Sequence, residues 1–287
     1  MLAKQAALML LLLSLFSDVI SLPTAASLNL CADSILLEVA DPEQIVSVSW
    51  LATDPSLSNY ADLASGYPNN RGRIEELVPH SPDFVFTGAN TSAVDNALLD
   101  RLGYRVIRLR PDNSLEDYRH NLLMVGKLLD RHDQANRLIS DLNRMLDMSS
   151  VQPPTNSKPQ AIIFQANGYS PGARTLPFEL LTLAGLTYLD KALLEWPNGR
   201  FLSVEELIYQ RPEIVVLAAL ELEHPSLADL YLQHPALEIK QTGTADDWQP
   251  MVVNVRERHM NCGSQYAAQA VRSMREARER YLTTRNK

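Results

Sequence analysis

The sequence lacks the short motifs that mark common catalytic sites. It has no Gly-x-Ser-x-Gly elbow, no glycine-rich phosphate loop, no His-Glu-x-x-His and no Cys-x-x-Cys. Its six histidines are scattered along the chain, whereas a zinc or manganese site needs several His and carboxylates that converge on one ion. We therefore expect neither an enzyme of these classes nor direct capture of a bare metal ion, and we expect no metal site and no cofactor.

The sequence also lacks a basic block. Lys and Arg number 26 against 34 Asp and Glu, which gives a formal net charge of −8. A net-acidic chain has no general positive field to attract nucleic acid or anionic lipid. We therefore expect no nucleic-acid partner.

Long hydrophobic runs are absent as well. The apolar run Ala6–Phe16 is shorter than the roughly 18 to 20 residues that a membrane span needs, and it follows a single Lys, so residues 1–21 are expected to be a signal peptide. Cleavage after Ser21 and after Ala26 both fit, and we favour Ser21 because the later cut would shorten the first predicted strand. Cys31 follows a leucine instead of the small residue of a lipobox, so we expect a soluble exported protein without a lipid anchor.

What the sequence does contain is two series of short β-forming runs with helical segments between them. The runs are Ala26–Leu30, Ile45–Val48, Phe84–Gly88 and Arg105–Leu109, then Ala161–Gln165, Ile214–Leu217 and Met251–Val255. Strands that alternate with helices predict parallel sheets built from βαβ units. We therefore predict an α/β protein with two Rossmann-like lobes.

Composition places the boundaries between these lobes. The N-terminal α/β lobe is expected over residues 22–132, a long interlobe helix over 133–148, a Pro- and Ser-rich linker over 149–160 and the C-terminal α/β lobe over 161–287. A helix bends far less readily than a loop. The connector should therefore hold the lobes at a nearly fixed separation.

One sequence pattern occurs twice in the chain. Arg73–Phe86 and Ser203–Val216 both contain Glu-Glu-Leu, then four residues, then Pro, an acidic residue and a β-forming run. The preference of acidic side chains for the first turn of a helix explains one such copy. Two copies at equivalent places in two lobes indicate a pair of exposed acidic groups that bind two equivalent basic sites on a symmetric partner.

Three stretches carry a family resemblance: "SLNLCADSILLEVADPEQIVSVSW", "RGRIEELVPHSPDFVFTG" and "FQANGYSPGARTLPFELLTLAGL". Together they resemble the periplasmic substrate-binding proteins of iron-siderophore and vitamin B12 ABC importers, over nearly the whole mature chain. The resemblance implies a bilobal fold with a helical backbone and a ligand held in the cleft between the lobes. It also implies that one Glu per lobe docks on arginines of the dimeric permease in the inner membrane. Carried over by position these are Glu75 and Glu205, with Glu76 and Glu206 as alternatives.

The same resemblance implies a monomeric periplasmic carrier that catalyses no reaction. Its ligand would be a metal chelate, and we favour a ferric siderophore, with cobalamin and haem next. A stiff interlobe helix further implies that the lobes close only slightly on the ligand.

Ligands of α/β sheets bind beyond the carboxyl ends of the strands. Large planar ligands also need aromatic walls and amide donors. These two criteria together select the candidate ligand-binding residues. They are Asn29, Cys31, Trp50, Asn90, Asn167, Tyr169, Arg256 and Cys262. For each aromatic residue, ordinary core packing is the alternative.

The two cysteines stand at the predicted cleft edge, one in each lobe. A disulfide between Cys31 and Cys262 is our first expectation for an exported protein, and it would join the lobes. It requires Cα atoms within about 7 Å. Two inert thiols come second, and contact with a soft metal or with cobalt comes third.

Two further functions stay open. A sensor or adaptor of the same fold would keep the two acidic groups for its partner but would bind no ligand, since a fold does not fix a function. A Cys-dependent enzyme would pair Cys31 and Asp33 with His259 and Cys262.

Overall fold

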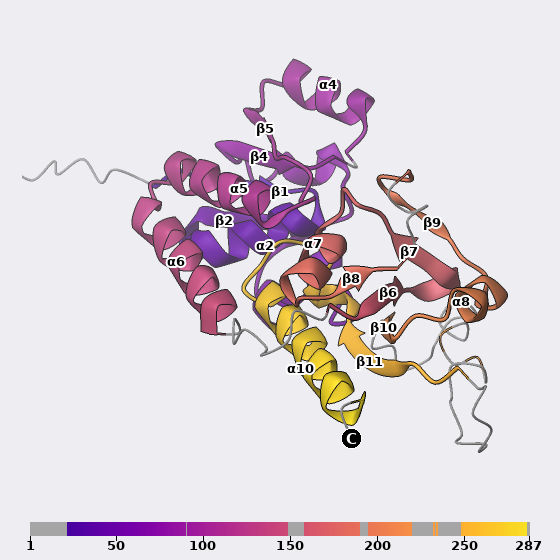
Figure 1. Cartoon of the computed structure of the whole chain (residues 1–287). Coiled ribbons are helices and arrows are strands. Elements are labelled where there is room, and N and C mark those ends of the chain that lie inside the picture. The colour runs from indigo at the N-terminus through magenta and orange to yellow at the C-terminus, as the bar shows by residue number, and fades with distance from the viewer. Residues whose placement is uncertain are drawn as a thin grey trace, which may run out of the picture.

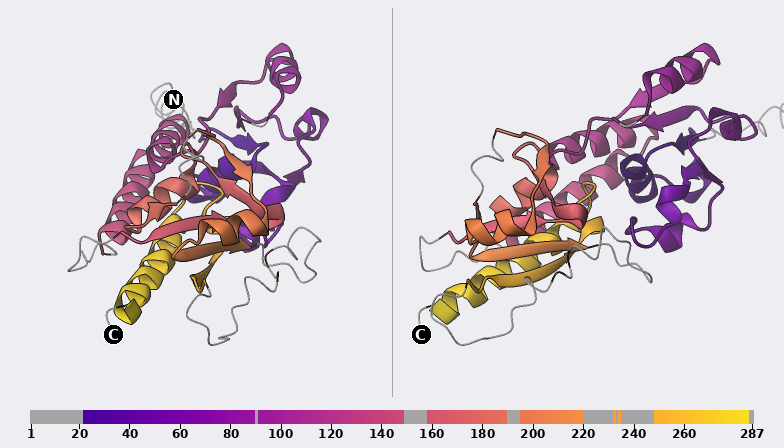
Figure 2. Two further views of the ribbon diagram at one scale, coloured as in Figure 1. Left: turned by 45° about the vertical axis from the view of Figure 1, so that its right-hand side comes forward. Right: turned by 90° about the vertical axis from the view of Figure 1, so that its right-hand side faces the viewer.

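The computed structural model describes residues 22–89, 91–148, 158–189, 195–219, 232, 234 and 248–285. Within these ranges the chain forms two lobes that occupy different halves of the molecule (Figures 1 and 2). The expected signal peptide over 1–21 and most of the expected linker lie outside the described residues. No helix in the described ranges has the length and apolar character that crossing a bilayer requires.

The N-terminal lobe is built on a five-stranded sheet in the order β3-β2-β1-β4-β5. All its neighbouring strands pair in parallel. The strands are β1 (Ala25–Ser27), β2 (Ile45–Ser49), β3 (Asn69–Asn70), β4 (Phe84–Thr87) and β5 (Val106–Arg108). The central strands β1 and β4 are buried along their whole length, as expected for a parallel sheet that is covered on both faces.

Helices and short 3-10 turns connect these strands. They are α2 (Leu30–Val39), η1 (Pro42–Gln44), η2 (Trp50–Thr53), α3 (Ala61–Ala64), η3 (Ile74–Leu77), α4 (Ala93–Arg101) and α5 (Leu115–Leu128). Each strand therefore leads at its carboxyl end into a turn or a helix, which brings these connections together along one edge of the sheet.

The C-terminal lobe has a four-stranded parallel sheet in the order β11-β10-β6-β8 and a separate antiparallel pair, β7-β9. The strands are β6 (Gln160–Phe164), β7 (Tyr169–Pro171), β8 (Thr187–Tyr188), β9 (Gly199–Phe201), β10 (Ile214–Ala219) and β11 (Met251–Arg256). The helical elements are η4 (Ala166–Gly168), α7 (Leu176–Leu183), α8 (Val204–Gln210), η7 (Glu257–His259) and α10 (Ala267–Arg285).

Helix α6 (His132–Met148) follows the N-terminal lobe, where a helix over 133–148 is expected. It packs against α2, α5 and α10. In Figure 1 it runs along the edge of the molecule from the N-terminal lobe toward α10. Its apolar side chains belong to the same core as residues of both sheets, among them Val48 and Ile163. The lobes therefore share one continuous apolar core.

The structure confirms the predicted α/β class with parallel sheets. It also places β-structure where no strand is predicted, in β3, β7, β8 and β9. These strands have two or three residues each, too few to show a hydrophobic period. Cys262 lies in the turn before α10.

Candidate ligand cleft and docking acids

A cavity of about 300 Å³ lies where the carboxyl edge of the N-terminal sheet meets the other lobe. The segments that follow β1, β4 and β5 line it, and Asn261 closes it from the C-terminal lobe. Its polar side chains are Asn29, Arg110, Asp112, Asn113, Asn121 and Asn261. Four amides, one guanidinium and one carboxyl group can donate hydrogen bonds to a polar group in this cavity or accept them from it.

Asn29 holds its place in the cavity through two constraints. Its side chain caps α2, because Oδ1 accepts hydrogen bonds from the backbone N–H of Cys31 at 3.1 Å and of Ala32 at 3.4 Å. Gly88, at the end of β4, leaves it room: a Cβ there would come within 2.6 Å of Asn29 Cγ. A larger residue at position 88 would therefore displace the Asn29 side chain.

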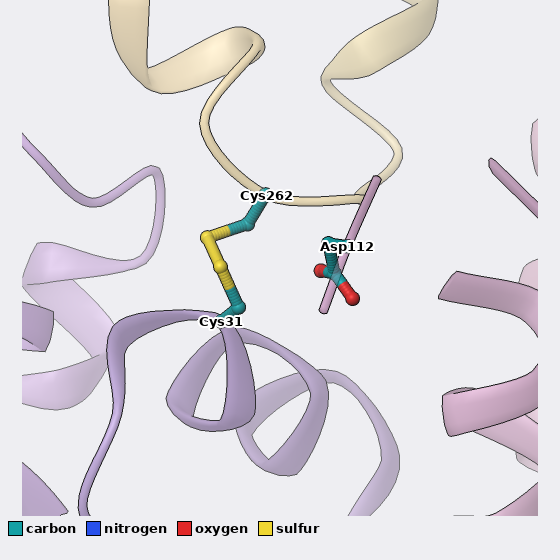
Figure 3. A group of neighbouring side chains, drawn as sticks. All are labelled: Cys31, Asp112 and Cys262. Carbon is teal, nitrogen blue, oxygen red and sulfur yellow. A yellow bond between two sulfur atoms is a disulfide. The ribbon is translucent and has the colours of Figure 1, made fainter. Parts of the chain in front are cut away.

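A disulfide joins Cys31 and Cys262. Their Cα atoms are 5.2 Å apart, inside the range that the bond requires, although 231 positions separate the residues in the chain. Of the three alternatives for the cysteines, the structure contains the first. Figure 3 shows the bond linking the start of α2 to the turn that precedes α10, so it connects the two lobes at the cavity.

Asp112 lies beside this disulfide (Figure 3). Its carboxylate accepts hydrogen bonds from Asn121 Nδ2 and from the backbone N–H of Gly263, each at 3.0 Å. Burial raises the pKa of Asp112 to about 6. The bond to Gly263 crosses from one lobe to the other, so Asp112 helps to hold the turn at 261–263 in place.

A second polar cluster sits at the lobe junction around Glu38. Its carboxyl group accepts hydrogen bonds from the hydroxyl groups of Tyr60 and Tyr118. Tyr266 of the C-terminal lobe packs edge-on against Tyr60, with ring centroids 5.6 Å apart. Burial raises the pKa of Glu38 to about 7, and the pKa values of both tyrosines that bond it rise, with burial as the main cause.

The C-terminal lobe contributes an aromatic corner. Tyr169 begins β7 just after Asn167, a residue in the left-handed region with φ of 57°. The Tyr169 hydroxyl donates to the backbone oxygen of Asn198, and its ring meets Phe201 of β9 edge-on at 5.5 Å between centroids. Phe201 is 66% exposed, so this corner presents aromatic surface to solvent.

The structure brings only part of the predicted ligand set together. Asn29 and Cys31 line the cavity, and Cys262 is joined to it through the disulfide. Trp50, 47% exposed, and the exposed Arg256 each stand at the carboxyl end of their own strand, β2 and β11, outside this cavity. Asn167 and Tyr169 belong to the aromatic corner, and Asn90 lies outside the described residues.

Sequence reasoning missed several of the cavity residues. Arg110, Asp112 and Asn113 follow β5 in the run "RPDN", and a polar run directly after a predicted strand is the signal that marks them. Asn121 had no such signal, because it lies inside α5 and reaches the cavity through its bonds to Arg110 and Asp112.

In both acidic segments the second Glu accepts a hydrogen bond from a backbone N–H that precedes it in the chain. Glu76 Oε2 accepts the backbone N–H of Arg71 at 2.6 Å. In the other lobe Glu206 accepts the backbone N–H of Ser203 at 2.9 Å and pairs with Arg200 at 3.1 Å. The second Glu of each pair therefore forms hydrogen bonds within its own segment.

The first Glu of each pair remains at the surface. Glu75 in η3 and Glu205 in α8 are both exposed. Hydrogen bonds from its own backbone N–H and from the Ser203 side chain lower the pKa of Glu205, which favours the charged form of this exposed carboxylate.

The Cys-dependent arrangement loses its nucleophile in this structure. Both sulfur atoms are in the disulfide, and His259 is buried with its ring 5.5 Å from that of Tyr266. A thiolate is the species that attacks in cysteine catalysis. The oxidised chain therefore offers none at this position.

Solved structures of several periplasmic proteins have a similar fold. The haem-binding protein RhuT of Roseiflexus sp. RS-1 aligns with a TM-score of 0.69 at 16% identity, over 90% of this chain and 99% of that one. A haem-binding protein of Pseudomonas aeruginosa gives 0.67 at 18%, over 90% and 92%. The vitamin B12-binding protein BtuF of Vibrio cholerae gives 0.64 at 14%, over 91% and 98%. At these identities the alignments show a common fold.

The comparison with curated proteins found no match. A family model described as "Periplasmic binding protein" matches residues 26–239, which is more than half of the chain. This span includes both acidic segments, the start of α2 and the aromatic corner. The chain belongs to this family of periplasmic binding proteins.

Proposed function

We propose that this chain is the periplasmic solute-binding component of an ABC importer, which captures a planar metal macrocycle, haem or a corrinoid, between its lobes. It then delivers the ligand to a permease in the inner membrane. The observation that carries the proposal is the cavity at the strand ends between two lobes, in a chain of the periplasmic binding protein family. Binding and release need no bond chemistry from this chain.

The choice of ligand moves away from the siderophore that the sequence favours. The similar structures above are described as haem-binding and vitamin B12-binding. A macrocycle with polar substituents suits aromatic walls beside amide groups. Trp50 and the corner of Tyr169 and Phe201 supply exposed aromatic surface, and the asparagine-rich cavity supplies amides.

The test is a titration of tryptophan fluorescence in the purified mature protein. Haemin, cobalamin and ferric siderophores of catecholate and hydroxamate type are added in turn. We expect saturable quenching by haemin or cobalamin at submicromolar concentration, and Trp50→Ala should weaken it. Trp248→Phe is the matched control, because Trp248 bonds the backbone oxygen of Pro212 near the opposite, amino end of the C-terminal sheet.

Quenching by a siderophore alone would contradict the choice of a planar macrocycle. An absence of quenching by every ligand, with binding to a permease intact, would favour the adaptor function. Equal quenching in the wild type and Trp50→Ala would show that the ligand does not bind beside Trp50 at the end of β2.

A further inference from the structure

Three metal-binding side chains meet at the lobe junction. The sulfur atoms of Cys31 and Cys262 and a carboxylate oxygen of Asp112 all lie within 4.8 Å of one another. They come from three separate segments: the first turn of α2, the loop after β5 and the turn before α10. Figure 3 shows the carboxyl group of Asp112 beside the disulfide.

We propose that this group is a redox-gated site for a soft divalent cation such as Zn²⁺. The site is closed while the disulfide is intact, because both sulfur atoms are bonded to each other. A dithiol reductant opens it: the dithiol gives two electrons and two protons to the Cys31–Cys262 bond, becomes a disulfide itself and leaves two thiols. The cation then displaces one proton from each thiol and binds two thiolates and the Asp112 carboxylate.

The donor set and its spacing suit zinc. Cysteine sulfur and aspartate oxygen are both common zinc ligands, at about 2.3 Å and 2.0–2.2 Å from the ion. A tetrahedral ion with these bond lengths places its ligands about 3 to 4 Å apart. The three atoms already lie within 4.8 Å, so side-chain rotation brings them to that spacing without movement of the lobes.

Hydrogen bonds from neighbouring groups fix the orientation of the Asp112 carboxylate, as they do for carboxylates that bind metals. Asn121 and the backbone N–H of Gly263 each donate to it at 3.0 Å. A carboxylate has about four lone-pair sites, so two remain for an ion. Asn121 is itself fixed, since its Oδ1 accepts the Arg110 backbone N–H at 3.1 Å. Such outer partners orient the ligand and raise metal affinity.

The surroundings favour thiolates and leave an open position. Cys31 lies in the first turn of α2, where the helix dipole stabilises a thiolate. Cys31 and Asp112 also line the cavity of about 300 Å³. Water or a group of the transported ligand can therefore take the fourth position.

The reduced chain keeps other bonds across the lobe junction. Gln265 Nε2 donates to the backbone oxygen of Leu138 at 2.7 Å, and Asn59 Nδ2 donates to that of Arg258 at 2.8 Å. The backbone N–H of Leu115 donates to Glu179 at 2.8 Å. These contacts keep the three donors assembled after the disulfide opens.

The experiment compares the oxidised protein with the same protein reduced by a phosphine under anaerobic conditions, without haem or corrinoid. Co²⁺ is titrated first, because thiolate ligation gives it a charge-transfer band, and Zn²⁺ then displaces it. We expect one ion per reduced chain and none per oxidised chain. Cys31→Ser with Cys262→Ser should abolish the band, and Asp112→Asn should weaken affinity at least about tenfold, the lower range for loss of a supporting group.

Glu116→Gln is the matched control, an exposed acid four positions from Asp112 that should leave the affinity unchanged. Equal metal binding by oxidised and reduced protein overturns the proposal, as does an unchanged affinity in Asp112→Asn. Loss of the far-UV circular dichroism of the reduced chain overturns it equally, because the donors are then no longer assembled. None of these outcomes depends on the transported ligand.

Discussion

Glu38 is a carboxyl group enclosed where the two lobes meet. Two tyrosine hydroxyl groups donate to it, and Gln134 Nε2 bonds its backbone oxygen at 3.1 Å. Burial disfavours the charged form more strongly than these bonds favour it, so its pKa rises to about 7. A group that ionises near neutral pH inside the lobe junction couples the stability of the fold to pH.

We expect the free energy of unfolding to fall as the pH rises from about 4.5 to about 7. Below this window Glu38 is protonated in both states. Within it the unfolded chain loses the proton while the folded chain keeps it, which costs up to about 3 kcal/mol by pH 7. Glu38→Gln should remove this part of the pH dependence and be the more stable form near pH 7.

Urea unfolding at pH 5 and pH 7.5 measures this difference. Glu43→Gln, at an exposed acid of η1, is the control and should keep the wild-type pH dependence. If Glu38→Gln has the same pH dependence as the wild type, Glu38 is not the group responsible.

The sequence could not predict this role for Glu38. It stands near the end of a ten-residue helix, where an acid usually faces water. The groups that enclose it, Tyr60 and Tyr118, lie 22 and 80 positions away. Asn29 is different: an Asn one position before a helix is a local cap signal, and the structure has that cap.

At the scale of elements, η3 exposes Glu75, and α8 exposes both Glu205 and Glu206. Glu76 and Glu206 bond their own segments, so we propose Glu75 and Glu205 as the acids that meet a partner. A dimeric permease with two equivalent basic sites would bind such a pair of acids.

We therefore expect Glu75→Arg with Glu205→Arg to abolish uptake through the importer, because like charges then face each other across the interface. Ligand affinity of the isolated protein should not change. The measurements are uptake by cells that carry the variant and fluorescence titration of the purified protein. The exposed acids Glu43 and Glu279, changed together to Arg, are the control. Uptake at the wild-type rate would rule out these two acids as docking groups.

The elements also show what a sequence can and cannot predict. Runs such as "FVFT" and "IVVLAA" are apolar and β-branched, and they form the buried strands β4 and β10 where expected. The pair β7-β9 carries the aromatic corner, yet "YSP" and "GRF" have no strand signal of their own. Their pairing depends on contacts between residues about thirty positions apart. The aromatic corner was therefore less predictable from the sequence than the strands of the two parallel sheets.

At the scale of the whole molecule, the lobes are held by more than one kind of contact. A continuous core runs through both sheets and α6, the disulfide joins α2 to the turn before α10, and Asp112 bonds Gly263 across the junction. A large hinge rotation would have to separate packed side chains as well as break polar bonds. A cut after Ser21 also suits the whole fold, since it leaves β1 intact whereas a cut after Ala26 divides it.

We therefore expect the lobes to move little when the ligand binds. Spin labels at Val94→Cys in α4 and Tyr209→Cys in α8, both highly exposed positions in different lobes, report their separation. Saturating cobalamin should shift the distance by no more than about 2 Å, the scale of small shifts at packed interfaces. The control pair, Leu63→Cys with Val94→Cys, lies within one lobe and should not change. A rotation of tens of degrees in the oxidised protein would contradict the shared core as the restraint. The same rotation seen only after reduction would assign the restraint to the disulfide alone.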